Sequence, residues 1–545
     1  MKPSLSLLAA ALSIALPAAA AGPISAVTPL WTFNHNVEPT IGRSAEIPAW
    51  DALTGTLWVV GGNGLDVLDL GGNRLQSYNT TAFGGINSLA ISGQTLALAF
   101  TNAVAASAPG SVQFFDTGTF LAQGGGAAYL GGVNAGAVPD MITWANGGKT
   151  LLVANEGERQ SNSNNPPGSI SLIDVQRNGG LTTTVRTATF NAFDGQEAAL
   201  RAQGVRIQAG VAASVAFEPE YIAVAPGGKT AMVTLQENNA LAVLDLQAAK
   251  ITDIVALGKK DFSLPGNAID PSDRDFVSGN SGPTRIELRN VPVKGLYMPD
   301  AIVSYSAGGK AFYVMANEGD AFVDDADIVR LRSNDVTLDP AVFPNATDLK
   351  DNANLGRLNI LREGANGSGS STNMSEIVAM GGRSFSIRDA DGKLVYDSGN
   401  ILEVQANLRG VYADGRSDDK GVEPEGVAVY ELNGRTLAFI GLERTTRSAV
   451  AIFDITDPEH VSFLDMIVSD DASVLRPEGL VAFSSGGKHF LAVAHESTAD
   501  TIVAGGLSNR TVLYEISPVP EPGAYALMLG GLAALGFVAR RRRRA

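Results

Sequence analysis

The sequence has no cysteine, and it has only four histidines among its 545 residues. Without cysteine the protein can form neither a disulfide nor a thiolate metal site. The histidines do not form an HExxH pattern, and no G-x-S-x-G elbow, phosphate-binding P-loop or dinucleotide-binding glycine fingerprint occurs. Several common enzyme classes, including zinc peptidases of the HExxH type, α/β-hydrolases and nucleotide-binding enzymes, are therefore disfavoured, and no catalytic residue can be predicted.

Basic residues are also scarce. Once Lys2, Arg540–Arg544 and Glu521 at the two ends are set aside, residues 22–517 carry 34 basic and 55 acidic side chains, a formal charge of −21. Nucleic acids and anionic membranes require basic surfaces, so neither is expected as a partner. A charge of this sign favours solubility and the binding of cations or basic partners.

The first 21 residues have the pattern of a secretory signal peptide. Lys2 is followed by an apolar run from Leu5 to Leu16, and Ala18–Ala21 gives a small-residue cleavage site before Gly22. A membrane anchor is the alternative, but a span needs about 20 apolar residues. The sequence therefore predicts export, with residues 1–21 removed.

Residues 518–545 contain three elements in a fixed order: a Pro-Glu-Pro motif, an apolar segment at 524–539 and an arginine cluster. The apolar segment is short for a full span, and the arginines would stop its transfer. A plain tail anchor is the alternative. The ordered triplet resembles the PEP-CTERM sorting signal of Gram-negative bacteria that make exopolysaccharide. This resemblance implies transient insertion into the inner membrane, processing by an exosortase-type enzyme, and a final place at the cell surface or in the extracellular matrix. The residues of the predicted motif are Pro520, Glu521, Pro522, Arg540, Arg541, Arg542, Arg543 and Arg544.

One pattern recurs along the chain: a Pro-acid pair, an apolar strand, a Gly-Gly-Lys turn, a second apolar strand and a polar-Glu pair. Near-complete copies begin at Val138, Glu218, Met298, Glu423 and Arg476, as in VPDMITWANGGKTLLVANEGE. Two weaker copies, from positions 45 and 86, precede them, and further strands follow most copies. Four strands per unit repeated seven times predict an all-β fold, a seven-bladed β-propeller of the YVTN or WD40 kind over residues 30–517, with the strand at Leu30 closing the ring.

The same region resembles the choice-of-anchor I domain family. The resemblance rests on QENNALAVLD, KDFSLPGNAIDPSDRD, VKGLYMPDAIVSY, ANEGDA and RSDDKGVEPEGVAV, and it covers nearly all of residues 30–517. It implies a propeller displayed through one of several surface anchors. Some members have been labelled alkaline-phosphatase-like, but the resemblance carries no catalytic site.

The repeats place two sets of acids at one end of the predicted propeller. The Pro-acid set is Asp140, Glu220, Asp300, Glu425 and Glu478, and the polar-Glu set is Glu156, Glu237, Glu318, Glu443 and Glu496. The turn residues Lys149, Lys229, Lys310, Lys488 and Arg435 should lie at the opposite end. Long insertions at 257–299, 320–383 and 398–424 belong to the acidic face, which indicates a binding face.

Repulsion within such a ring would be relieved by a hard divalent cation with oxygen ligands, most readily Ca²⁺. The alternative is that these carboxylates only cap turns between blades. An acidic loop in the second insertion, with Asp320, Asp324, Asp325 and Asp327, could add ligands. Arg383, Arg416 and Lys420 could bind an anion such as phosphate. The predicted metal ligands are Glu156, Glu237, Asp300, Glu318, Asp320, Asp324, Glu425, Glu443, Glu478 and Glu496.

Two functions remain open on these grounds. The first is a surface binding platform that holds exopolysaccharide or another surface protein, with a divalent cation on its acidic face. The second is a metal-dependent hydrolase of phosphate esters, alkaline-phosphatase-like or phytase-like, or of lactones, in which the metal polarises the substrate and activates water. The sorting tail and the missing catalytic motifs favour the first.

Overall fold

The computed structural model describes residues 23–35, 43–159, 161, 164–276, 279–322, 324–496 and 509–519. The predicted signal peptide, the Pro-Glu-Pro motif, the apolar tail segment and the arginine cluster lie outside these residues. Within the described residues, no helix is both long enough and apolar enough to cross a membrane.

Most of the chain forms four-stranded antiparallel sheets, of which the described residues contain seven. The first four, in chain order, are β2 (Arg43–Asp51), β3 (Thr56–Gly62), β4 (Gly64–Leu68) and β5 (Arg74–Asn79); β6 (Gly85–Ser92), β7 (Thr95–Thr101), β8 (Pro109–Asp116) and β9 (Tyr129–Ala137); β10 (Pro139–Ala145), β11 (Thr150–Asn155), β12 (Ser169–Arg177) and β13 (Leu181–Thr189); β14 (Pro219–Val224), β15 (Thr230–Leu235), β16 (Ala240–Asp245) and β17 (Lys250–Ala256). The other three are β20 (Ile302–Ala307), β21 (Lys310–Asn317), β25 (Ser384–Asp389) and β26 (Leu394–Asp397); β27 (Pro424–Leu432), β28 (Arg435–Leu442), β29 (Ala449–Asp454) and β30 (Ser462–Val468); β31 (Pro477–Ser485), β32 (Lys488–His495), β33 (Arg510–Pro518) and β1 (Ile24–Asn34).

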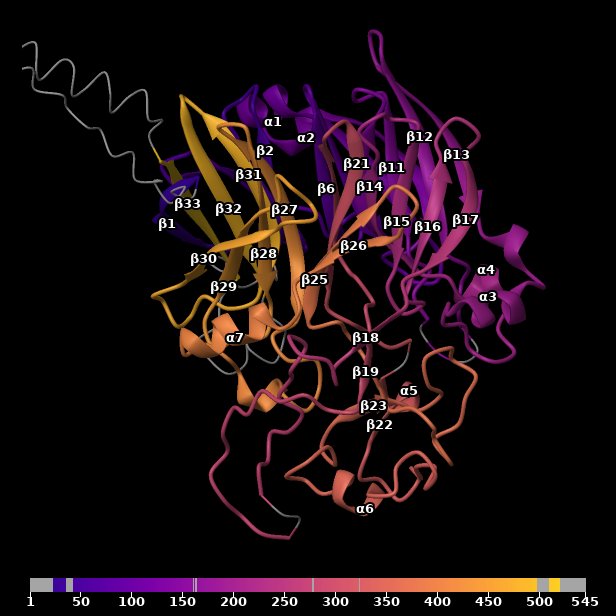
Figure 1. Cartoon of the computed structure of the whole chain (residues 1–545). Coiled ribbons are helices and arrows are strands. Elements are labelled where there is room, and N and C mark those ends of the chain that lie inside the picture. The colour runs from indigo at the N-terminus through magenta and orange to yellow at the C-terminus, as the bar shows by residue number, and fades with distance from the viewer. Residues whose placement is uncertain are drawn as a thin grey trace, which may run out of the picture.

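The first strands of these sheets contact one another in the closed order β2, β6, β10, β14, β20, β27, β31 and back to β2. Each sheet is therefore a blade around a common axis, and Figure 1 shows the blades standing side by side. The second strands are buried over most of their length, and β11 over all of it, because blades pack on both of their faces. The prediction of an all-β propeller is confirmed.

The ring is closed by the N-terminal strand. β1 pairs antiparallel with β33 and so completes the sheet of β31 and β32, as the strand at Leu30 predicted. Buried His35, directly after β1, connects this blade to the first one. Its Nδ1 lies 2.8 Å from Asp66 Oδ2 and its Nε2 lies 2.8 Å from Thr511 Oγ1.

Replacing His35 with leucine should therefore loosen the closure. The change removes two buried hydrogen bonds and leaves polar atoms of Asp66 and Thr511 without these partners, which costs about 2–4 kcal/mol in the free energy of unfolding. Urea denaturation of both proteins measures the loss. His460→Leu is the control, because His460 is exposed and, within the described residues, pairs only with its neighbour Asp457. Equal stability of the two variants would contradict a closing role for His35.

The predicted loop insertions at 257–299 and 320–383 are not loose loops but a folded lobe, seen below the blades in Figure 1. Its strands are β18 (Lys259–Asp261), β19 (Lys294–Leu296) and β24 (Val378–Ala379) in one sheet, with β22 (Ile328–Arg330) and β23 (Asn359–Leu361) in another. The lobe has its own buried apolar cluster, which includes Phe262, Val293, Leu331 and Ile360. The insertion of residues 398–424 contains α7 (Ile401–Leu408) and the short helix η3 (Asp414–Arg416).

The remaining helices are short and lie between strands. They are α1 (Thr117–Gln123), α2 (Gly125–Ala128), η2 (Asn191–Phe193), α3 (Glu197–Gln203), α4 (Ala213–Ala216), α5 (Asp324–Asp327) and α6 (Ala346–Leu349). The connection that contains η2, α3 and α4 runs from the end of β13 to the start of β14, so these three helices lie at the end of the propeller that carries the acids.

Candidate functional site

The Pro-acid residues occupy a bulge at the start of the first strands. In β10 the pairing passes from Pro139–Asn155 to Ile142–Val153, so β10 has one residue more than β11 at Asp140. The same register shift occurs in β14, β27 and β31. A bulge turns a side chain out of its regular position and is common next to functional sites.

The backbone before the Pro-acid pair is strained. Val138, Met298, Glu423 and Arg476 each precede a proline and have positive φ angles of 45°, 45°, 49° and 56°. Positive φ is costly for residues other than glycine, above all for the β-branched Val138. The same unusual conformation in four blades shows that the fold holds the acidic residues in a defined place.

The second set of acids lies at the same end. The N–H groups of Glu156, Glu443 and Glu496 donate to the carbonyl oxygens of the strained residues Val138, Glu423 and Arg476, at 2.9, 2.9 and 3.1 Å. Because β10 and β11 are antiparallel and Ala145 pairs with Thr150, the turn at Lys149 lies at the far end. The strand pairing thus agrees with the predicted separation of acids and turn lysines.

Between the blades and the lobe lies a cavity of about 700 Å³. Among the described residues, twelve carboxylates but only three cationic side chains line it. The carboxylates are Glu46, Asp140, Glu220, Asp300, Glu318, Asp320, Asp419, Glu423, Glu425, Glu443, Glu478 and Glu496, and the cations are Arg416, Lys420 and Arg444. Most predicted ligands are among them, but Glu156 and Glu237 do not line the cavity. Asp324 lies in α5, but its side chain is not among the parts of the chain that the structure describes.

Sequence reasoning missed three wall carboxylates, Glu46, Asp419 and Glu423. Asp419 lies in the 398–424 insertion, outside the repeats, so no pattern marked it. Glu46 belongs to a weak copy of the repeat in which no proline precedes the acid, so the pattern did not mark it. Glu423 stands two residues before Glu425 in the stretch Glu-Pro-Glu, which is the only sequence signal for it.

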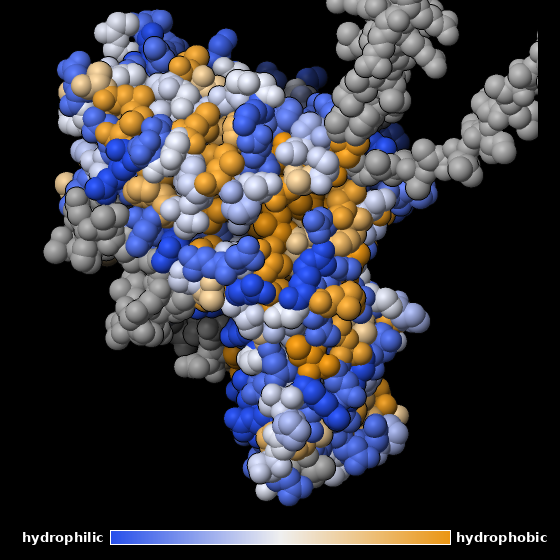
Figure 2. All heavy atoms as spheres, turned by 90° about the vertical axis from the view of Figure 1, so that its left-hand side faces the viewer, coloured by the Kyte–Doolittle hydropathy of each residue, from blue (hydrophilic) through white to orange (hydrophobic). Residues whose placement is uncertain are grey.

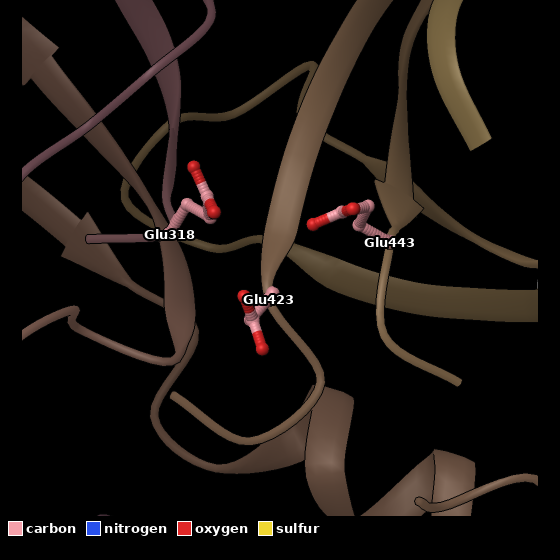
Figure 3. Close-up of side chains that lie close together, drawn as sticks. All are labelled: Glu318, Glu423 and Glu443. Atoms are coloured by element: carbon pink, nitrogen blue, oxygen red, sulfur yellow. The ribbon is translucent and has the colours of Figure 1, made fainter. Parts of the chain in front are cut away.

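Three carboxylates on one side of the cavity form a close triad. Glu318, Glu423 and Glu443 each offer an oxygen within 4.8 Å of the others, and Figure 3 shows them pointing toward one another. Lys420 Nζ lies 2.6 Å from Glu318 Oε1 and 3.1 Å from Glu423 Oε2.

Two arginines complete this charge balance. Arg416 Nη2 lies 2.6 Å from Glu423 Oε1, and Arg444 Nε lies 2.9 Å from Glu443 Oε2. The triad therefore has one cationic partner for each carboxylate. Its members come from the ends of β21 and β28 and from the residue before β27, whereas Lys420 and Arg416 come from the 398–424 insertion.

The acids of the first strands lack such partners. We call Glu46, Asp140, Glu220, Asp300, Glu425 and Glu478 the axial carboxylates. Within the described part of the chain, the side chains of Glu220, Asp300, Glu425 and Glu478 make no ion pair or hydrogen bond. Glu220 is only 9% exposed. A role as turn caps would require hydrogen bonds from backbone N–H groups, so it does not account for these four.

Burial and mutual repulsion disfavour ionisation of the axial carboxylates. Burial, the largest cause, raises the pKa of Glu46 and of Asp140 to about 7. It raises the pKa values of Glu220, Asp300, Glu425 and Glu478 well above their usual range, with neighbouring carboxylates as the next cause. These groups resist ionisation unless a cation enters.

The structure corrects the prediction of an anion site. Arg383 is buried and donates to the carbonyl oxygens of Asp270, Ser417 and Asp419 and to Glu403. Arg416 and Lys420 pair with the triad. The prediction that the acidic loop adds metal ligands is corrected in part. Asp327 is buried, and its carboxylate accepts a hydrogen bond from Arg206 Nη2 at 2.9 Å. Asp320, in contrast, lines the cavity. The charges of these cations are thus already matched within the protein.

The fold and the cavity define a β-propeller with an acidic axial cavity roofed by an inserted lobe. The chain belongs to the choice-of-anchor I domain family, whose model matches residues 46–458, and residues 518–544 match the PEP-CTERM protein-sorting motif. It is therefore an exported protein of the cell envelope, and the motif implies processing by an exosortase. No curated protein matches the sequence.

Solved structures resemble the chain only distantly. Hydrazine synthase of Kuenenia stuttgartiensis has a TM-score of 0.45 at 12% identity, with 83% of this chain and 93% of that chain covered. The Pan2 WD40 domain of Neurospora crassa has a TM-score of 0.43 at 8% identity, with 91% and 96% covered. The periplasmic gluconolactonase PpgL of Pseudomonas aeruginosa has a TM-score of 0.39 at 12% identity, with 88% and 98% covered. The assignment of the fold rests on the strand pairing described above.

Proposed function

We propose that the protein is a binding platform of the cell surface whose axial carboxylates hold a divalent cation, with Ca²⁺ as the expected ion. The observation that carries this proposal is the set of buried and half-buried axial carboxylates that have no cationic partner within the described residues, in a cavity of about 700 Å³. Carboxylate oxygens suit a hard cation, and the chain has no cysteine to favour a softer one.

The electrostatic argument has a definite size. Two like charges about 10 Å apart repel by about 1.7 kcal/mol at an effective dielectric constant of 20. Several ionised axial carboxylates would together cost several times this amount. One divalent cation replaces this repulsion with attraction, as long as the carboxylates become its ligands.

We place the cation at the axial carboxylates and not at the triad. The triad is the closest group of carboxylates, but Lys420, Arg416 and Arg444 already match its charge. A second cation there would have to displace Lys420. A bound axial cation that keeps open coordination positions would attract carboxylate or hydroxyl oxygens of a surface polysaccharide or of a partner protein.

Thermal unfolding tests this proposal. A ligand that binds only the folded state stabilises it by about 2.7 kcal/mol at a hundredfold excess over Kd. Millimolar Ca²⁺ should therefore raise Tm by several degrees at pH 8, and a chelator should reverse the shift. Glu220→Gln with Asp300→Asn should remove most of it.

The matched control is Glu459→Gln with Asp470→Asn, which makes the same charge change at exposed positions. This control should keep the full Ca²⁺ shift. A Tm that is the same in Ca²⁺, Mg²⁺ and chelator would refute the cation site.

A metal-dependent hydrolase is the second candidate. The observation in its favour is the size of the cavity, because about 700 Å³ leaves room for a phosphate ester or a lactone beside a metal ion held by the axial carboxylates. Purified residues 22–517 would be assayed with phosphomonoesters, phytate and lactones, with and without Ca²⁺. Turnover that needs Ca²⁺ and is lost in Glu220→Gln would favour the hydrolase over the binding platform.

The sorting motif gives a separate prediction. Replacing Pro520, Glu521 and Pro522 with alanines should stop processing, so the protein should stay in the membrane fraction of a host that has an exosortase. Mass spectrometry of the surface fraction should find wild-type protein without residues 1–21 and without Arg540–Arg544. Recovery of the intact arginine cluster at the surface would contradict processing.

A further inference from the structure

A second, smaller cavity lies directly beneath the axial carboxylates. It has a volume of about 190 Å³ and shares Ile47, Tyr221 and Glu478 with the acidic cavity. We call it the axial channel. Because liquid water takes about 30 Å³ per molecule, the channel has the volume of about six water molecules.

The wall of the axial channel is largely apolar. Leu89, Ile142, Ile302, Val427 and Leu480 line it, each from the first strand of a different blade. Asp140, Asp300, Glu425 and Glu478 stand two residues before four of these side chains and line the acidic cavity. The same strands thus bring a ring of carboxylates next to an apolar channel on one axis.

A divalent cation would use only the charged half of this arrangement. A ligand with an ammonium group and an aliphatic chain would use both halves. The protein already binds such a group in the same cavity, because the ammonium of Lys420 lies 2.6 Å from Glu318 and 3.1 Å from Glu423. Across the cavity, Glu220 is nine-tenths buried and has no partner within the described residues.

We propose that the axial carboxylates and the axial channel together bind a primary alkylamine, with the ammonium among the carboxylates and the aliphatic chain in the channel. This inference rests on the proposed function in one respect, that the axial carboxylates bind cations. It adds the chemical class of an organic ligand, which charge alone would not specify.

A chain-length series tests the proposal. Calorimetric titration of the whole exported protein, residues 22–517, with propylamine, butylamine, pentylamine and hexylamine should give a Kd that falls about fourfold for each added methylene until the channel is filled. Ca²⁺ should compete with every amine. A Kd that does not change with chain length would overturn the role of the channel.

Two variants locate the aliphatic chain. Val303→Phe and Leu480→Phe each add a ring to the wall of the channel, so both should lose the dependence on chain length while keeping the Ca²⁺ shift in Tm. The kept Ca²⁺ shift shows that a variant is folded. Val185→Phe, on exposed β13, is the control and should bind hexylamine like the wild type. Unchanged hexylamine binding by both folded channel variants would also overturn the proposal.

A lysine side chain of a partner protein has the same chemistry as a free amine. Titration with Nα-acetyl-lysine amide beside hexylamine distinguishes these sources, because the tighter ligand identifies the one that the site prefers. If Ca²⁺ binds and no amine does, the alkylamine proposal fails alone. If neither binds, the cation-binding function fails with it.

Discussion

Replacing Asp140 with asparagine is expected to stabilise the metal-free protein at pH 8 by on the order of 4 kcal/mol. Asp140 is a half-buried member of the axial carboxylates, and loss of hydration raises its pKa from 3.8 to about 7. One pKa unit corresponds to about 1.4 kcal/mol, so ionising this group in the folded protein costs roughly three times that amount. Asparagine keeps a similar shape and removes the charge.

The sign of the pH dependence follows from linkage. Between about pH 4 and pH 7 the folded protein binds more protons at Asp140 than the unfolded chain does, so stability falls as pH rises through this window. In chelator the wild type should therefore lose more stability from pH 5 to pH 8 than Asp140→Asn does. With Ca²⁺ present the difference in stability between the two proteins should become smaller, because only the wild type retains the full ligand set.

Urea denaturation at pH 5 and pH 8, with Ca²⁺ and with chelator, measures both effects. Asp470→Asn is the control, because Asp470 is exposed and its replacement should leave the pH dependence unchanged. If Asp140→Asn were the less stable protein at pH 8 in chelator, the axial carboxylates would be stabilising caps after all.

Replacing Arg383 with methionine is expected to destabilise the protein by about 3–5 kcal/mol. The guanidinium is 1% exposed and lies 3.2 Å from Glu403, which is itself fully buried. Methionine would leave that carboxylate buried without its partner, and breaking one side of a buried pair costs about this much. The hydrogen bonds to Asp270, Ser417 and Asp419 would be lost as well.

The structural readout should be localised. Because Arg383 joins the 257–299 insertion to the 398–424 insertion, amide exchange should rise first in the lobe and in α7, and later in the blades. Arg285→Met is the control, since Arg285 and its partner Glu287 are both exposed, 66% and 50%, and such pairs contribute little. A loss of protection spread evenly over all blades would contradict a local role for Arg383.

The sequence by itself determined that the chain forms a propeller. It also determined which end of the propeller carries the acidic residues. The repeat places a Pro-acid pair before one strand and a polar-Glu pair after the next. In an antiparallel hairpin these two positions must meet at one end while the turn lysine lies at the other. Nothing beyond strand periodicity and chain direction is needed for that conclusion. The exported, envelope location likewise follows from the tail motif, which is read directly from sequence.

Only the tertiary structure decided which acids remain without partners. Glu318 and Lys420 are 102 residues apart, and Arg383 and Asp270 are 113 apart, and neither pair lies in a repeat that would predict the contact. The insertions have no periodicity, so the sequence showed them as loops, although their apolar residues form a lobe with its own core. Small displacements also matter, because Glu156 and Glu237 occupy the predicted end of the propeller and still do not line the cavity. Charge balance in a buried site depends on distances of a few ångströms between distant segments, and those distances are set by packing.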